Sequence, residues 1–103
     1  MRVKMLLPED IIMKVRHDFT EDEEISILQM LSTYQQQHPD QPTRILRCIV
    51  FLANGSFEKF AEAIALARLD WRDLVVSAEY FGWPCREHRR RNFNEPFVAS
   101  QEN

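Results

Sequence analysis

The chain has 103 residues, of which 45% are hydrophobic and 11% aromatic, and it carries a net charge of −3. This length predicts a single domain that buries a core without disulfides or metal, and the hydrophobic content excludes an intrinsically disordered chain. Only two glycines are present, which disfavours a turn-rich all-β fold. The acidic balance excludes a molecule that binds polyanions over its whole surface.

Two cysteines, Cys48 and Cys85, are too few for a disulfide framework. We expect Cys48 to be a buried thiol and Cys85 an accessible one in a reducing cytosol. The apolar run before Pro8 is too short for an export signal, and no stretch approaches the roughly 18 uncharged apolar residues that a membrane span needs. The sequence therefore predicts a cytoplasmic protein with no membrane partner.

The first predicted helix begins at Pro8, a residue favoured in the first helical turn, and the two acidic residues that follow suit the positive helix end. Apolar residues then recur at intervals of four, as they do on one face of a helix: Ile11, Val15 and Phe19. Because isoleucine, methionine and valine also crowd this stretch, a short strand within residues 3–15 is the alternative.

A capping box opens the second predicted helix. Thr20 can accept a hydrogen bond from the backbone of Glu23, whose side chain can reach back to Thr20. The helix runs to about Gln37, and two prolines in the following loop end it. The acidic side chains of residues 21–24 lie at the positive end of the helix dipole, which favours a solvated first turn over a metal site.

Residues 45–53 are apolar apart from Arg47, which predicts a buried central helix. Thr43 can cap the start of this helix. The pair Asn54 and Gly55 predicts a left-handed stop at its end.

Two further helices are predicted over residues 57–69 and 71–81, each opened by a capping side chain, Ser56 for the first and Asp70 for the second. The apolar face of the second consists of Trp71, Leu74, Val75, Ala78 and Phe81. Because the connections are short, neighbouring helices should pack as antiparallel hairpins. We therefore expect an all-α fold, a compact bundle of about five short helices, with one domain over residues 1–84 and an extended C-terminal tail over residues 85–103.

Three stretches between residues 44 and 80 form a recognisable pattern: Arg44 to Gly55, Ala67 to Leu74 and Ala78 to Tyr80. In these stretches, which span about a third of the chain, the sequence resembles a set of small uncharacterised bacterial all-helical proteins. The resemblance implies a cytosolic bacterial origin. It implies no activity, cofactor or catalytic residue.

Arg47 lies among apolar neighbours on the central predicted helix. Because an unpaired buried charge is costly, we expect a structural ion pair between Arg47 and a carboxylate of the last predicted helix, Asp73 or Glu79. The alternative is an anion pocket, in which Arg44 and Arg47 offer paired donors to a carboxylate or phosphate. In the ion-pair interpretation, loss of Arg47 should destabilise the fold more than loss of Arg44.

The C-terminal part contains the only basic cluster: Arg86, Arg89, Arg90 and Arg91. Three aromatic residues flank it: Tyr80, Trp83 and Phe93. Arginine and aromatic residues dominate interface energies, so we expect these seven residues to form a binding surface. Three interpretations of the arginine cluster are open. It is a solvated tail, it pairs with an acidic protein surface, or it binds nucleic acid through phosphate contacts and base stacking. The aromatic residues, with Phe81 and Phe97, either form an exposed patch or fold back over the helix ends.

Cys85 and His88 have the residue types of a nucleophile and its base. With His17 and His38 they could also suggest zinc, but structural zinc sites usually show two ligand pairs. No oxyanion-hole signature, phosphate-binding glycine loop or dinucleotide fingerprint accompanies them. We therefore expect no metal, no cofactor and no catalytic site.

The sequence favours a non-enzymatic protein–protein interaction module, such as an adaptor, a regulator or an immunity-type protein. We expect another protein to bind at the end of the last predicted helix and the C-terminal tail. The alternative is a small nucleic-acid-binding regulator that uses Arg86 to Arg91, and an enzyme using Cys85 and His88 is a distant third. If the tail serves only for binding, deletion of residues 86–103 should leave the helical fold intact.

Overall fold

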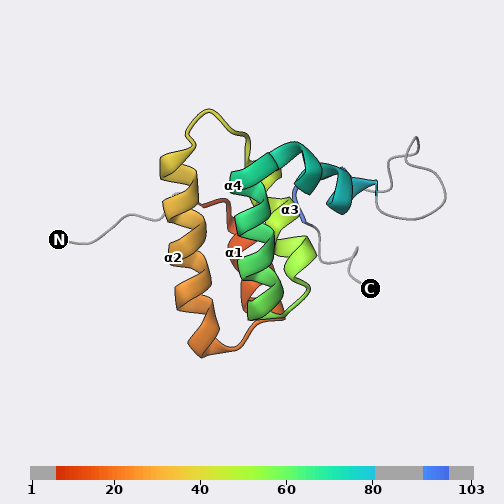
Figure 1. Cartoon of the computed structure of the whole chain (residues 1–103). Coiled ribbons are helices and arrows are strands. Elements are labelled where there is room, and N and C mark those ends of the chain that lie inside the picture. The colour runs from red at the N-terminus through yellow and green to blue at the C-terminus, as the bar shows by residue number, and fades with distance from the viewer. Residues whose placement is uncertain (1–6, 81–91, 98–103) are drawn as a thin grey trace.

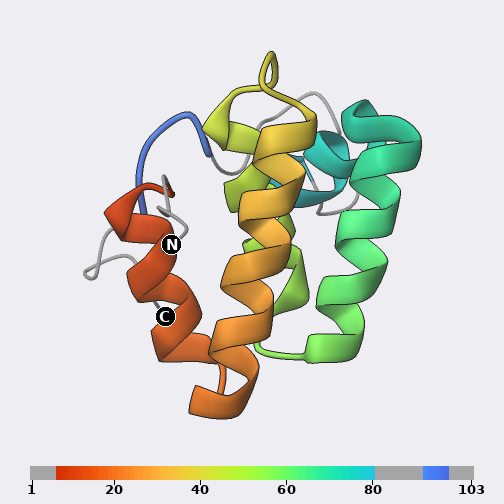
Figure 2. The same cartoon turned by 90° about the vertical axis from the view of Figure 1, so that its left-hand side faces the viewer.

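The structure is a computed structural model that describes residues 7–80 and 92–97. Within these residues the chain forms four helices and no strand: α1 (Glu9–Asp18), α2 (Glu21–Gln37), α3 (Thr43–Ala53) and α4 (Phe57–Glu79). Helix α3 packs mainly against α4 and also contacts α1, while α1 contacts α2. Figure 2 shows α1 and α4 on opposite sides of α2, with α3 behind them. The expected all-α fold is confirmed, and four helices replace the expected five in the part of the chain described.

The first two helices begin where the sequence predicts. Pro8 precedes α1, whose first residue is Glu9, so the strand alternative is wrong from Glu9 onward; residues 3–6 lie outside the described part. At the start of α2, Thr20 Oγ1 accepts a hydrogen bond from the Glu23 amide at 3.2 Å, and Glu23 Oε1 accepts one from the Thr20 amide at 3.3 Å. The predicted capping box is therefore confirmed.

The start of α3 differs from the expectation. Pro42, in extended conformation, occupies the capping position, and Thr43 is the first helical residue. The Thr43 hydroxyl makes no cap, because it accepts a hydrogen bond from Arg47 Nη1, one turn ahead, at 3.3 Å. The predicted left-handed stop is confirmed, since φ is 49° at Asn54 and 80° at Gly55.

Helix α4 replaces the two predicted helices over residues 57–69 and 71–81. Ser56 caps its start as expected, accepting the Lys59 amide at 3.2 Å. At Asp70 the backbone leaves helical geometry (φ −159°, ψ 92°), and α4 bends near its middle (Figure 1). The Asp70 carboxylate accepts the Arg72 amide at 3.1 Å, as a capping residue does. The sequence therefore predicted the position of the helix break correctly, but the two halves of α4 follow each other without an intervening turn.

The core is formed around α3, on which nearly every side chain from Ile45 to Val50 is buried. Cys48 is fully buried, as expected. The other helices and the segment 92–97 contribute the remaining core side chains, among them Ile11, Val15, Ile27, Leu31, Tyr34, Phe60, Leu74 and Phe93. The core is thus built from residues that lie far apart in the sequence.

The segment 92–97 folds back onto the helices, with Phe93 in the core and Phe97 packed against it. The Phe93 ring is buried, with its centroid 5.1 Å from that of Phe51 on α3 and 5.7 Å from that of Phe97. The segment therefore gains apolar burial that a solvated tail would forgo. The domain boundary that we expected after residue 84 lies outside the described residues.

Candidate functional site

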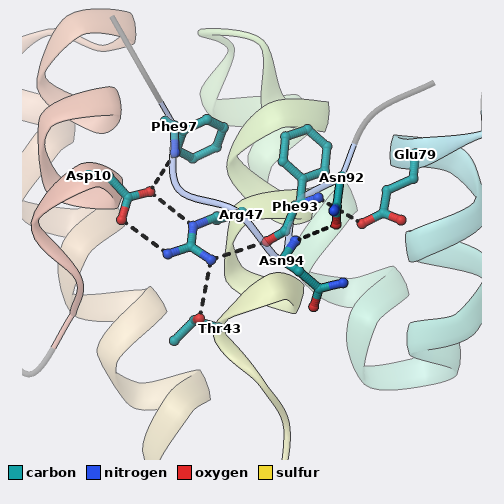
Figure 3. A network of polar contacts seen from close by, with 8 residues as sticks. All are labelled: Asp10, Thr43, Arg47, Glu79, Asn92, Phe93, Asn94 and Phe97. Atoms are coloured by element: carbon teal, nitrogen blue, oxygen red, sulfur yellow. Dashed lines mark hydrogen bonds and ion pairs between the residues drawn. The ribbon is translucent and has the colours of Figure 1, made fainter. Parts of the chain in front are cut away.

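Two ion pairs, each with one buried and one partly exposed member, organise the region where 92–97 meets the helices. Arg47 pairs with Asp10 of α1, through Nε to Oδ2 at 2.9 Å and Nη2 to Oδ1 at 3.1 Å (Figure 3). The expected pairing of Arg47 with Asp73 or Glu79 is therefore wrong. Asp73 is exposed on α4, and Glu79 is bound to Arg44.

Arg44 and Glu79 form the second pair. Arg44 donates from Nε to Glu79 Oε2 at 2.8 Å and from Nη2 to Oε1 at 2.6 Å. Arg44 and Arg47 are three residues apart, so they point about 60° apart around α3, one toward α4 and the other toward α1. Because each guanidinium already has a carboxylate partner, the anion pocket that we considered is also wrong.

The segment 92–97, which we call the strap, is held through its main chain. The Phe93 amide donates to Glu79 Oε2 at 3.0 Å, and the Phe93 carbonyl accepts from Arg47 Nη1 at 3.1 Å. The Phe97 amide donates to Asp10 Oδ2 at 2.9 Å (Figure 3). We call the four side chains of Asp10, Arg44, Arg47 and Glu79 the cradle. The cradle therefore joins α1, α3 and α4 to a backbone segment far along the chain.

Aromatic contacts anchor the strap. Phe93 packs on Phe51, and Lys14 Nζ lies 5.7 Å from the centre of the half-buried Phe97 ring. Phe93, which we expected at an exposed interface, is therefore buried, and the folded-back alternative holds for Phe93 and Phe97. Tyr80 is partly buried just after α4.

The contacts of the cradle favour the charged form of Asp10. Burial alone would raise the pKa of Asp10, but hydrogen bonds from Arg47 and from the Phe97 amide, with the Arg47 charge, outweigh it and lower that pKa below 3.8. Hydrogen bonds with Glu79 raise the pKa of the Arg44 guanidinium above its ordinary value. Glu79 is 0% exposed, and its carboxylate accepts hydrogen bonds from Arg44 and from the Phe93 amide.

A second surface lies at the bend of α4. Leu69 is 83% exposed and Trp71 is 40% exposed, and the Arg72 guanidinium lies 5.3 Å from the Trp71 ring centre. A hydrophobic residue directly before a capping residue often packs against the side chain that lies five positions later in the sequence, in the helix that follows. Here that residue is Leu74, which is fully buried, while Leu69 points into solvent. We call Leu69, Trp71 and Arg72 the kink patch.

The sequence interpretation missed the kink patch. The apolar spacing assigned Trp71 to an inward helical face, and Leu69 was not singled out. The signal that could have found it is the position of Leu69 directly before the capping Asp70 at a helix break. Whether a leucine there packs or projects depends on the bend angle, which the sequence does not specify.

Of the remaining candidate residues, the structure describes His17 and His38, which have separate partners. His17 lies beside Asp18, with Nδ1 and Oδ1 2.9 Å apart, and the His38 ring stacks on Tyr34 at 4.2 Å. No group of three His, Cys, Asp or Glu side chains within 7–80 and 92–97 could hold a metal. The expected sites at Trp83, Cys85, His88 and the arginines Arg86, Arg89, Arg90 and Arg91 lie outside the described residues.

None of the helices in the described part of the chain is both long and apolar enough to cross a membrane. No family model, curated protein or solved structure matches this chain. The likeness of residues 44–80 to small bacterial helical proteins stays a prediction from the sequence. The geometry of the cradle and the kink patch is the basis for the two proposals that follow.

Proposed function

We propose that the protein is a non-enzymatic protein–protein interaction module, an adaptor or regulator, that binds another protein through the kink patch. The observation that carries this proposal is the 83% exposure of Leu69 next to the 40% exposure of Trp71. Single exposed apolar side chains are ordinary on protein surfaces. An exposed leucine beside an exposed tryptophan and an arginine is a combination that binding surfaces favour.

The composition and order of the kink patch support this role. Tryptophan and arginine are the residues most enriched among those that dominate interface energies. Arg72 lies over the Trp71 ring within the distance of a cation–π contact, which holds both side chains in one arrangement before binding. Less side-chain entropy is then lost on association. The partner that fits is a protein surface with an apolar recess for Leu69 and a flat apolar face for Trp71.

The C-terminal arginines and Trp83 remain part of the proposed interface as a sequence prediction. Phe93 does not, because its ring is in the core. The contact surface within the described residues therefore moves from the tail to the bend of α4.

Photo-crosslinking in the cells that produce the protein tests the proposal. A photoreactive residue replaces Leu69 in one version and Met13 in the control. Met13 is also exposed and apolar, but it lies on α1, across the molecule from α4 (Figure 2). We expect a discrete protein adduct from position 69 that is absent from position 13 and is lost when Trp71→Ala is added.

The same partner, once purified, should bind the Leu69→Glu variant at least tenfold more weakly than the unchanged chain, whereas Met13→Glu should bind equally well. Identical adducts from both positions, or equal affinities, would contradict the proposal. An adduct that disappears on nuclease treatment would instead favour a nucleic-acid-binding regulator.

A further inference from the structure

We propose that the cradle is a peptide-binding site for a short turn-forming segment of a partner protein with two aromatic side chains four residues apart, and that the strap occupies this site in the free protein. The site shares no residue with the kink patch, so this proposal and the proposed function can be tested independently of each other. Like other peptide-binding sites, it would hold the segment through its backbone and select it through the positions that its side chains fill.

The first step is that the cradle is complete without the strap. Arg44 makes two hydrogen bonds to Glu79, and Arg47 makes two to Asp10. Thr43 accepts a further bond from Arg47. All these groups lie on α1, α3 and α4, so departure of the strap would leave both ion pairs intact. The helices therefore present a preformed site, which a binding site requires to keep its reorganisation cost low.

The second step is that the cradle forms hydrogen bonds with main-chain atoms of the strap. These are the amide and carbonyl of Phe93 and the amide of Phe97. Every one of these bonds joins a peptide group to a charged side chain, which makes it stronger than a bond between neutral groups. Any segment that adopts the same turn can offer these amides and this carbonyl, provided that no proline stands at either amide position.

The third step is that the side-chain contacts supply selectivity. Phe93 fills a buried position against Phe51, and Phe97 lies half-buried below Lys14. The two rings also contact each other, with centroids 5.7 Å apart. A segment that lacked either aromatic ring would leave apolar surface of α3 or α1 in water. The partner segment is thereby limited to two aromatic residues with three residues between them.

The fourth step is that the strap is not tied into regular secondary structure. Its own hydrogen bonds form a local turn. Asn92 Oδ1 accepts the Asn94 amide at 3.1 Å (Figure 3), and the Asn92 carbonyl accepts the Glu95 amide at 3.1 Å. Removing the strap therefore breaks no helix or sheet. Such segments open at lower free energy than core helices do.

In the unchanged chain, the strap competes with any added peptide for the cradle. A segment attached by a short linker competes at an effective concentration on the order of millimolar. A free peptide with the same sequence should consequently bind the unchanged chain only weakly. The competing strap must first be weakened without altering the cradle.

The experiment uses the full chain with Phe93→Ala and a terminally blocked synthetic peptide that has the sequence of residues 92–97. Ligands that bind only the folded state raise the melting temperature as their concentration rises. We expect a concentration-dependent rise for this variant, with at least tenfold weaker apparent binding to the unchanged chain. A control peptide with alanine at both phenylalanine positions should have no effect. No rise at millimolar peptide, or an equal rise with the control, would overturn the proposal.

If Phe93→Ala does not fold, Phe97→Ala replaces it, because the Phe97 ring is only half-buried. A second measurement needs no variant. In the unchanged chain, the amides of Phe93 and Phe97 should exchange with deuterium at least tenfold faster than the buried amides of α3, since the strap opens before the core. Exchange of these amides only on global unfolding would overturn the proposal. So would a concentration-dependent dimer that Phe93→Ala abolishes, because the segment would then come from a second copy.

Discussion

At the scale of single residues, the two cradle arginines each hold a carboxylate that is largely removed from water. Each does so with two hydrogen bonds. Exposed ion pairs, by contrast, contribute little, because solvent screens them. The difference leads to a direct comparison among three arginines.

We predict that Arg47→Ala and Arg44→Ala each lower the free energy of unfolding by about 3–5 kcal/mol, because each leaves a buried carboxylate without its partner. The sequence alone had suggested a much smaller effect for Arg44. Glu79 is fully buried, so the two losses should be similar. Arg16→Ala is the control, because the exposed Arg16–Glu24 pair should contribute only about 0–1 kcal/mol. Urea unfolding measures all three, and equal small effects would contradict the prediction.

The pH dependence of stability should report on Asp10. Its pKa in the folded chain lies below 3.8, its value without these contacts, so its charged form is bound more strongly in the folded state. The resulting stabilisation is present above pH 3.8 and is lost as the pH falls through the folded pKa. We therefore predict that Asp10→Asn destabilises the chain at pH 7 and that the difference from the unchanged chain shrinks at pH 2–3.

Denaturant unfolding at several pH values measures this difference. Asp73→Asn on the exposed face of α4 is the matched control, and its effect should stay within about 0.5 kcal/mol at neutral pH. A destabilisation by Asp10→Asn that is the same at pH 7 and at pH 2 would show that geometry, and not the charge of Asp10, is responsible.

At the scale of elements, the bend in α4 is set by one capping side chain. Asp70 interrupts 23 residues of helix and satisfies the Arg72 amide, which the bend would otherwise leave without an acceptor. The second half of α4 is thereby redirected so that Leu74 and Ala78 are buried and Glu79 reaches Arg44. The same bend projects Leu69 outward.

We predict that Asp70→Ala lowers the free energy of unfolding by about 0.5–2 kcal/mol, the range for loss of a capping side chain. Asp70→Asn should have a smaller effect, because asparagine caps equally well. Thermal or urea unfolding distinguishes the two variants. An unchanged or increased stability of Asp70→Ala would mean that the bend is imposed by packing and not by the cap.

At the scale of the whole molecule, the strap links parts of the fold that lie far apart in the sequence. It connects residues near the C-terminus with α1, near the N-terminus, through the Phe97 amide and Asp10, which are 87 positions apart. It also covers Phe51 on the central helix. The expectation that residues 86–103 can be deleted without effect on the fold therefore no longer holds, because that segment contains the strap.

We predict that Phe93→Ala lowers the free energy of unfolding by about 3–5 kcal/mol, as removal of a buried phenylalanine ring typically does. A stop codon after residue 91 should destabilise the chain at least as much. Phe57→Ala is the control, because the Phe57 ring is exposed at the start of α4 and its loss should cost much less. Equal effects of Phe93→Ala and Phe57→Ala would show that the strap does not contribute to the fold.

The sequence by itself determined the features whose causes are local. The Thr20 and Ser56 caps, the left-handed stop at Asn54 and the break at Asp70 each depend on residues within a few positions of one another. The burial of Cys48 followed in the same way from helical periodicity, because spacing along a helix fixes which residues share a face.

Only the tertiary structure decided which charges meet and where the C-terminal segment lies. The periodicity of α3 shows that Arg47 is buried, but Asp10, Asp73 and Glu79 were equally available as carboxylates, and the choice depends on how α1 and α4 pack around α3. The aromatic strap was ambiguous for the same reason. Contacts between segments up to 87 positions apart depend on the packing of the whole chain, and no local pattern in the sequence encodes it.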